Sequence, residues 1–235
     1  TTTDNSATSA QQTAAVKSPV MSAEIIGSEP AAGEETANTP EIRNEAAVQT
    51  PAVDIEKAMQ PRVLGVENAP VTIEEFASLT CSHCAHFHKE TFSKLKESYI
   101  DTGKVRFIFN DFPLNTPARD ASMVARCLPH DRYFKFIGFL FQTQDQWAYS
   151  SDYAKALKQN AKLLGGTEEV LDSCLQSEDL KKALAAHMQD AAQKYEIQST
   201  PSFVLNGSEI MKGAQPFEAF QEKIDKLLEE SNTAE

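Results

Sequence analysis

Two of the four cysteines, Cys81 and Cys84, are separated only by Ser82 and His83. At this spacing the two sulfur atoms can form a disulfide with little movement of the backbone. The pair follows a β-branched segment and opens a helical pattern, so the free N–H groups of a helix start would lower the pKa of the first thiol. His83 can add positive charge or a hydrogen-bond donor to the same sulfur. Because a stabilised thiolate is a good leaving group, this pattern predicts thiol–disulfide redox chemistry.

A zinc site is the main alternative for the same residues. Cys81 and Cys84 could supply two ligands, and His86 or His88 a third. However, structural zinc usually recruits a second pair of cysteines, and the other two cysteines stand 47 positions apart. A regular helix is also a poor zinc knuckle. We therefore favour redox chemistry over zinc or two inert cysteines. His88 lies on the apolar stripe and is expected in the core, whereas His86 faces away.

A strand–helix–strand unit is predicted to position this pair. Residues 71–76 form a β-branched strand, and a helix begins at Cys81. Gly103 stands where that helix should end, and residues 105–109 form a second strand. This order indicates a βαβ unit with a parallel sheet. The apolar positions of the helix recur at spacings of three and four: Cys84, His88, Phe92, Leu95 and Tyr99.

The next 80 residues show helical periodicity, and the strand pattern then returns. Five helices are expected, the first capped by Thr116 with Pro117 at its start. Aromatic residues of this block are expected to form its core: Tyr133, Phe134, Phe136, Phe139, Phe141 and Trp147. Asn206-Gly207 between two short apolar runs predicts a β-hairpin, and a helix follows from Pro216. The simplest construction is one α/β domain with a helical insertion.

The composition places the folded part in the last two thirds of the 235 residues. No aromatic residue precedes Phe76, and the first 60 residues are rich in Thr, Ala, Ser, Glu and Pro, which predicts disorder. This segment is either a passive linker or a tether to a removed membrane anchor or signal region. The net charge of −12 and the lack of a basic stripe disfavour nucleic-acid binding. The chain begins with Thr, so we expect that a signal peptide has been removed.

Several short motifs together resemble the DsbA family of bacterial thiol–disulfide oxidoreductases. They are Arg62-Val63-Leu64-Gly65, Asn68-Ala69-Pro70-Val71-Thr72-Ile73, Glu75-Phe76, Cys81-Ser82-His83-Cys84 and Ser199-Thr200-Pro201-Ser202-Phe203. The resemblance implies a thioredoxin fold with an inserted all-helical subdomain. Residues 1–61 would form a disordered acidic tail, 62–113 the first half of the thioredoxin fold, 114–195 the helical subdomain, and 196–235 the second half.

The resemblance also assigns roles to particular residues. Cys81 would be the exposed nucleophile and Cys84 its buried partner. Glu75 matches the family's acidic residue beneath the disulfide, where it can exchange protons with Cys84. Pro201 matches the family's cis-proline, and the loop that contains Thr200 and Pro201 would bind an extended substrate peptide. No cofactor is implied.

One residue inside the shared motifs differs from the best-known members, and two further cysteines lie outside these motifs. Ser82 stands where the best-known members have proline, so the reduction potential can differ from theirs. Cys127 and Cys174 stand near the ends of two predicted helices, beside apolar neighbours. We favour a structural disulfide between them over two buried free thiols.

The implied function is to introduce disulfides into exported proteins in the bacterial periplasm. A membrane oxidase of the DsbB type would then re-oxidise the protein. One alternative keeps the site but uses it for disulfide isomerisation or reduction. A second alternative is a peptide-binding or metal-binding module on a thioredoxin scaffold.

Overall fold

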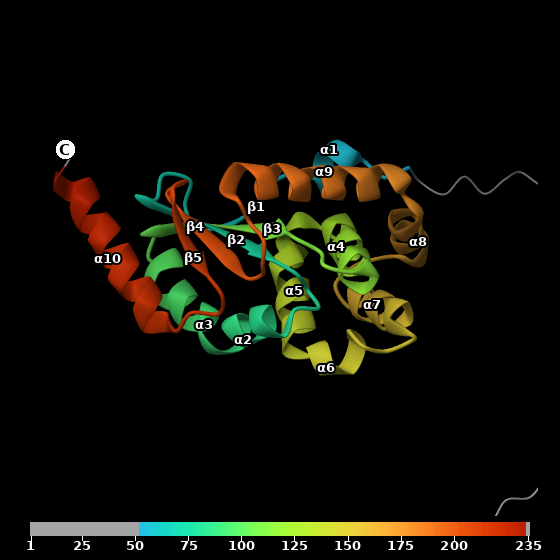
Figure 1. The fold of residues 1–235 in the computed structure, drawn as a ribbon. Helices are drawn as coiled ribbons and strands as arrows, with labels where there is room; N and C mark the ends of the chain where they lie inside the picture. Colours follow the sequence, from blue (N-terminus) through green and yellow to red (C-terminus); the bar gives the residue numbers. More distant parts are fainter. Residues whose placement is uncertain (1–51, 234–235) are drawn as a thin grey trace, which may run out of the picture. The chain divides into compact units, whose positions relative to one another are not determined.

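A five-stranded sheet lies at the centre of the computed structural model, which describes residues 52–233 (Figure 1). Its order is β1-β3-β2-β4-β5; β2 and β3 are parallel, and the other neighbouring pairs are antiparallel. The predicted βαβ unit is confirmed by this pairing. The strands are β1 (Arg62–Leu64), β2 (Val71–Ala77), β3 (Val105–Asp111), β4 (Ser202–Leu205) and β5 (Glu209–Lys212).

Alternation along β2 divides the core between the two faces of the sheet. Ile73 faces a large cluster that includes Phe87 of α2 (Ser82–Glu90) and Phe220 of α10 (Phe217–Thr233). Phe76 faces the opposite way and packs with residues of α9 (Glu178–Tyr195), including Tyr195. Figure 1 shows α9 along one side of the sheet and α2 with α10 along the other. Glu75 therefore shares the face of Ile73, beneath α2.

The helix predicted from Cys81 is divided into three consecutive pieces. After α2 come α3 (Phe92–Leu95) and the π-helical turn η1 (Lys96–Ile100). Thr91 separates α2 from α3, is buried, and donates its hydroxyl to the carbonyl of Gln215 at 3.1 Å. This contact ties the end of the helix to the segment that precedes α10.

The insertion between β3 and β4 is helical, as predicted. It contains α4 (Thr116–Cys127), the 3-10 turn η2 (His130–Arg132), α5 (Tyr133–Gln142), α6 (Gln144–Trp147), α7 (Tyr153–Lys162), α8 (Glu168–Gln176) and α9. Asn115, not Thr116, caps α4, because the Asn115 Oδ1 accepts the N–H of Ala118 at 2.9 Å. Most of the predicted aromatic core is buried, but Phe139 is 42% exposed, so its assignment to the core was wrong.

The hairpin predicted at Asn206-Gly207 joins β4 to β5. Both residues have positive φ angles, 46° and 73°, which Asn and Gly adopt most easily. The side chain of Asn206 also accepts the N–H of Thr72 at 2.7 Å, which fixes the hairpin to the neighbouring strand.

The predicted disordered tail requires a correction at its end. Residues 1–51 lie outside the described part of the chain, but residues 52–61 are placed and contain the helix α1 (Ile55–Ala58). Asp54 caps this helix by accepting the N–H of Lys57 at 3.0 Å. Ala58 is buried against Leu180 and other apolar residues. Composition alone missed this short helix because tertiary contacts, not its own sequence, hold it in place.

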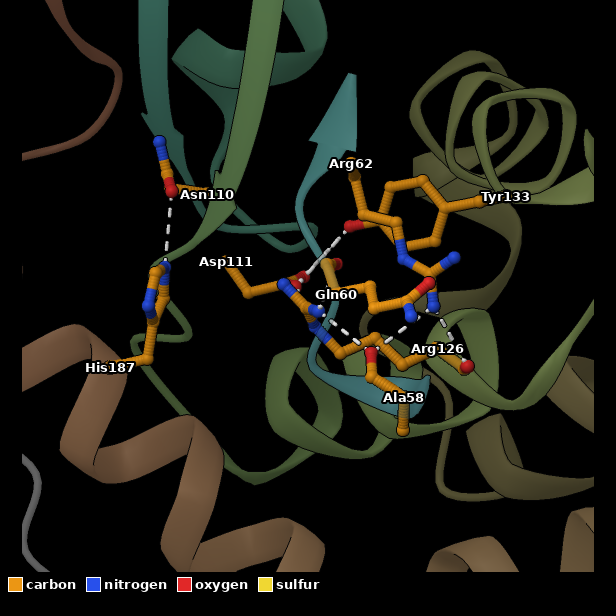
Figure 2. A network of polar contacts seen from close by, with 8 residues as sticks. All are labelled: Ala58, Gln60, Arg62, Asn110, Asp111, Arg126, Tyr133 and His187. Atoms are coloured by element: carbon orange, nitrogen blue, oxygen red, sulfur yellow. Dashed lines mark hydrogen bonds and ion pairs between the residues drawn. The ribbon is translucent and has the colours of Figure 1, made fainter. Parts of the chain in front are cut away.

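A buried polar network anchors α1 to the insertion (Figure 2). The guanidinium groups of Arg62 and Arg126 both donate to the carbonyl of Ala58, at 3.1 and 2.9 Å. Arg126 also pairs with the fully buried Asp111 at 2.6 Å, and the hydroxyl of Tyr133 donates to the same carboxylate. Burial raises the pKa of Tyr133 well above its ordinary value, and the charge of Asp111 raises it further. Arg126 thus pairs with the buried carboxylate, while Arg62 donates to the main-chain carbonyls of Ala58 and Arg126.

Candidate active site

Cys81 occupies the N-cap position of α2 and is half-buried. Its backbone is extended, and its carbonyl accepts the first helical hydrogen bond, from Ala85, at 3.1 Å. Cys84 lies one turn inside the helix and is 0% exposed. Both are free thiols in the structure. One sulfur can therefore be reached from solvent, while the other is sealed beneath it.

The surroundings of Cys81 favour its thiolate form. Its pKa is lowered to about 5, first by a hydrogen bond with the side chain of Cys84 and then by the nearby side chain of Thr200. The backbone N–H groups of Cys84 and His83 contribute in the same direction, whereas burial opposes them. The imidazole of His83 is exposed, so the structure shows His83 acting on this sulfur through its main chain. At neutral pH Cys81 is almost entirely ionised.

Cys84 has the opposite environment. Burial raises the pKa of its thiol well above the ordinary value, and the hydrogen bond to Cys81 and the negative charge of Glu75 raise it further. The two sulfurs therefore differ strongly: Cys81 is a stable leaving group, and Cys84 keeps its proton. This asymmetry suits a disulfide that is attacked at Cys81.

Glu75 is fully buried on β2, on the face that α2 covers. Its two carboxylate oxygens lie 3.1 and 2.9 Å from Nε2 of His88, which is also buried. The sequence placed His88 in the core, where the structure also has it, but sequence reasoning missed that it is the partner of Glu75. Two signals pointed toward the pair: the resemblance placed Glu75 beneath the disulfide, and His88 lies on the apolar stripe of the helix that carries Cys84.

The loop before β4 brings Thr200 and Pro201 to the thiol of Cys81. The peptide bond between Thr200 and Pro201 is cis. When Cys81 is protonated, its thiol donates to the carbonyl of Thr200 at 3.4 Å. The hydroxyl of Thr200 is buried and forms no hydrogen bond within the described part of the chain. Cys81 and Thr200, which are 119 positions apart in the sequence, are thus brought into contact at the sulfur of Cys81.

A residue that sequence reasoning did not identify holds the loop before α2. Gln144, at the start of α6, is 2% exposed and donates from Nε2 to the carbonyls of Leu79 and Cys81, at 2.9 and 3.0 Å. The helical insertion is thereby connected directly to the nucleophile. No spacing or motif marks this glutamine, since only the fold brings it to Cys81.

Cys127 and Cys174 form a disulfide between the end of α4 and α8, with a Cα–Cα distance of 6.4 Å. It belongs to the insertion and not to the Cys81 site. Within residues 52–233, no three His, Cys, Asp or Glu side chains are grouped to hold a metal ion. His86, which the zinc alternative would use, is exposed on the far side of α2 from His88. The same residues include no helix with the length and apolar character of a membrane span.

Comparison with known proteins places this geometry in a family. The family model described as Thioredoxin matches residues 57–226. A putative protein-disulfide oxidoreductase from Rickettsia felis is 34% identical over 169 residues, which cover 72% of this chain and 60% of that protein. The chain thus spans about three fifths of the length of this relative. A probable disulfide bond formation protein D from Bacillus cereus is 30% identical, over 70% of this chain and 77% of that protein.

The fold is also similar to a solved structure. The crystal structure of Wolbachia pipientis alpha-DsbA1 matches with a TM-score of 0.70 and 29% identity, and the match covers 75% of this chain and 94% of that one. The chain is thus similar, in sequence and in structure, to proteins whose names refer to disulfide formation or to DsbA. The chain belongs to the thioredoxin family and, within it, to the DsbA-like proteins.

Proposed function

We propose that this protein introduces disulfides into exported proteins through a Cys81–Cys84 redox disulfide. The observation that carries the proposal is the contrast between the two sulfurs: Cys81 is half-buried with a pKa lowered to about 5, and Cys84 is sealed with a raised pKa. A substrate thiolate attacks Sγ of Cys81, and Cys84 leaves. A second substrate thiol then attacks the mixed disulfide and releases Cys81 as a stable thiolate.

The substrate chain would lie beside Thr200 and Pro201. The carbonyl of Thr200 is within 3.4 Å of the reacting sulfur, so an extended peptide joined to Cys81 can bond to this segment of main chain. The expected setting is the bacterial periplasm, with a DsbB-like membrane oxidase that restores the Cys81–Cys84 disulfide. Bacillus disulfide bond formation proteins among the relatives support a role with protein substrates.

The test is the equilibrium reduction potential of the Cys81–Cys84 pair in glutathione buffers, with Cys127 and Cys174 quantified separately by alkylation and mass spectrometry. We expect a potential near or above about −220 mV; a value near that of thioredoxin, about −270 mV, would contradict the oxidase and favour a reductase. Reduced ribonuclease A is the probe substrate. The oxidised protein should form disulfides in it stoichiometrically.

Two variants complete this experiment. Cys81→Ala should abolish the reaction. In Cys84→Ala the free thiolate of Cys81 should attack a disulfide of scrambled, oxidised ribonuclease and accumulate as a mixed disulfide, because no Cys84 is present to release it. Recovery of native ribonuclease from a scrambled, fully oxidised form would favour an isomerase. Activity that survives Cys81→Ala, or stoichiometric zinc in the purified protein, would favour a binding module on the same fold.

A further inference from the structure

The buried pair of Glu75 and His88 lies close enough to Cys84 for Glu75 to act electrostatically on its thiol. Glu75 has a side-chain exposure of 0%, and His88 of 3%. One imidazole nitrogen, Nε2, lies within hydrogen-bond distance of both carboxylate oxygens. A buried carboxylate is costly without such a partner. His88 also follows Cys84 by four residues, so both side chains leave the same face of α2.

Aromatic rings enclose the imidazole. Phe141 of α5 stacks on it with a centroid distance of 4.1 Å and an interplanar angle of 15°. Phe87, Phe92 and Phe109, from α2, α3 and β3, contact it at 5.3, 4.7 and 6.1 Å. None of these rings ionises. Over residues 52–233, Glu75 is the one ionisable side chain that forms a hydrogen bond or ion pair with His88. Within the described residues, His88 therefore has no ionisable hydrogen-bond partner other than Glu75 with which to share a proton.

When the disulfide opens, Sγ of Cys84 must take up a proton. When a substrate thiolate attacks Sγ of Cys81, the electrons of the sulfur–sulfur bond move to Sγ of Cys84. This buried thiolate is unstable, because burial favours the protonated form of Cys84. The proton must come from a group inside the fold or wait for solvent to enter.

We propose that His88 is a positioning residue that keeps a proton available on Glu75, so that the pair protonates Cys84 as the disulfide opens. The proposal rests on the function proposed above. The pair loses one proton to Cys84 and regains one from solvent through His88, the member of the pair that retains some exposure. On re-oxidation the pair accepts the proton of Cys84, whose sulfur then attacks the disulfide that joins Cys81 to the oxidant.

The experiment measures how fast a small thiol, dithiothreitol, opens the Cys81–Cys84 disulfide in the oxidised full chain between pH 5 and pH 9. His88→Gln retains a hydrogen-bond donor near Glu75 but cannot carry the exchangeable proton. His86→Gln is the matched control, because His86 is an exposed histidine on the same helix. Since a small thiol replaces the protein substrate, failure of the proposed oxidase activity would not affect this measurement.

General acid–base groups typically contribute 10²–10⁴-fold to a rate, and Glu75 remains in the variant, so we expect a loss of about tenfold. The loss should change with pH, and His86→Gln should match the wild type. In a Glu75→Gln background, His88→Gln should have no further effect, because His88 acts through Glu75. Wild-type rates and pH profile in His88→Gln, or an equal loss in the Glu75→Gln background, would overturn the proposal.

A second measurement on the wild-type protein covers the case in which His88→Gln does not fold. Nitrogen NMR of the labelled imidazole reports the protonation of His88 in the oxidised and the reduced protein. We expect the His88 signals to differ between the two forms and the His86 signals to coincide. Identical His88 signals in both forms across the pH range would contradict a role in proton exchange.

Discussion

Lowering the pH from about 9 to about 5 should destabilise the reduced protein more than the oxidised protein. In the reduced folded state the pKa of Cys81 is about 5, compared with an ordinary value of 9.0 that applies after unfolding. Between these two values the folded state holds Cys81 as a thiolate while the unfolded state holds it as a thiol. The unfolded state thus binds one more proton, so stability rises with pH in this window.

The size of the effect follows from the two pKa values. A difference from 9.0 to about 5 corresponds to about 5 kcal/mol at 1.36 kcal/mol per pH unit. Because Cys81 is only half-buried, solvent screening reduces this to about 2 to 3 kcal/mol. The contribution is complete above about pH 9 and disappears as the pH falls through 5. Cys84, whose pKa is raised, stays protonated in both states below about pH 9 and does not add to it.

The assay is chemical denaturation of the oxidised and the reduced protein at several pH values, followed by circular dichroism. Other ionisable groups titrate in both forms, so the difference between the two free energies of unfolding isolates the redox pair. Cys81→Ser in the reduced form is the control and should show the pH dependence of the oxidised protein. If the difference between the two wild-type forms is the same at pH 5 and pH 8, the folded state does not stabilise the thiolate, and the reasoning is refuted.

Three further predictions concern buried contacts made by the helical insertion. Gln144→Leu leaves the buried carbonyl of Leu79 without its hydrogen-bond donor, so we expect a loss of about 1 to 3 kcal/mol in stability and slower formation of the mixed disulfide. The control Gln146→Leu, at an exposed position, should show neither effect. Asp111→Asn leaves the buried guanidinium group of Arg126 without its carboxylate and should cost about 3 to 5 kcal/mol by denaturation, whereas a cost below 1 kcal/mol would show that the ion pair is not needed. Replacing Cys127 and Cys174 together by Ala removes a 47-residue loop closure and should lower stability by up to about 4 kcal/mol; an unchanged melting temperature would argue against this constraint.

Local signals in the sequence were sufficient for the strand–helix–strand unit, the helical character of the insertion, the hairpin and the reactive pair, but they missed α1, β1 and α6. Strand and helix periods placed β2, α2 and β3, because alternation and three-to-four spacing are imposed by the backbone itself. The spacing of Cys81 and Cys84 indicated the chemistry, because two sulfurs at this separation can form a disulfide and the helix start can stabilise the first one as a thiolate. The resemblance to the DsbA family added expectations for Glu75 and Pro201 that one sequence does not carry by itself.

Contacts between distant segments were decided only by the tertiary structure. The pairing of Glu75 with His88, and the bonds from Gln144 to the loop of Cys81, depend on how β2, α2 and α6 pack together. The helix α1 exists because buried arginines bind the carbonyl of Ala58, and composition cannot report such a contact. Periodicity shows which face of an element is buried. Which polar groups meet there depends on three-dimensional packing. In this protein packing brings Thr200 close to Cys81 and buries Cys84 near Glu75, and these surroundings lower the pKa of the first thiol and raise that of the second.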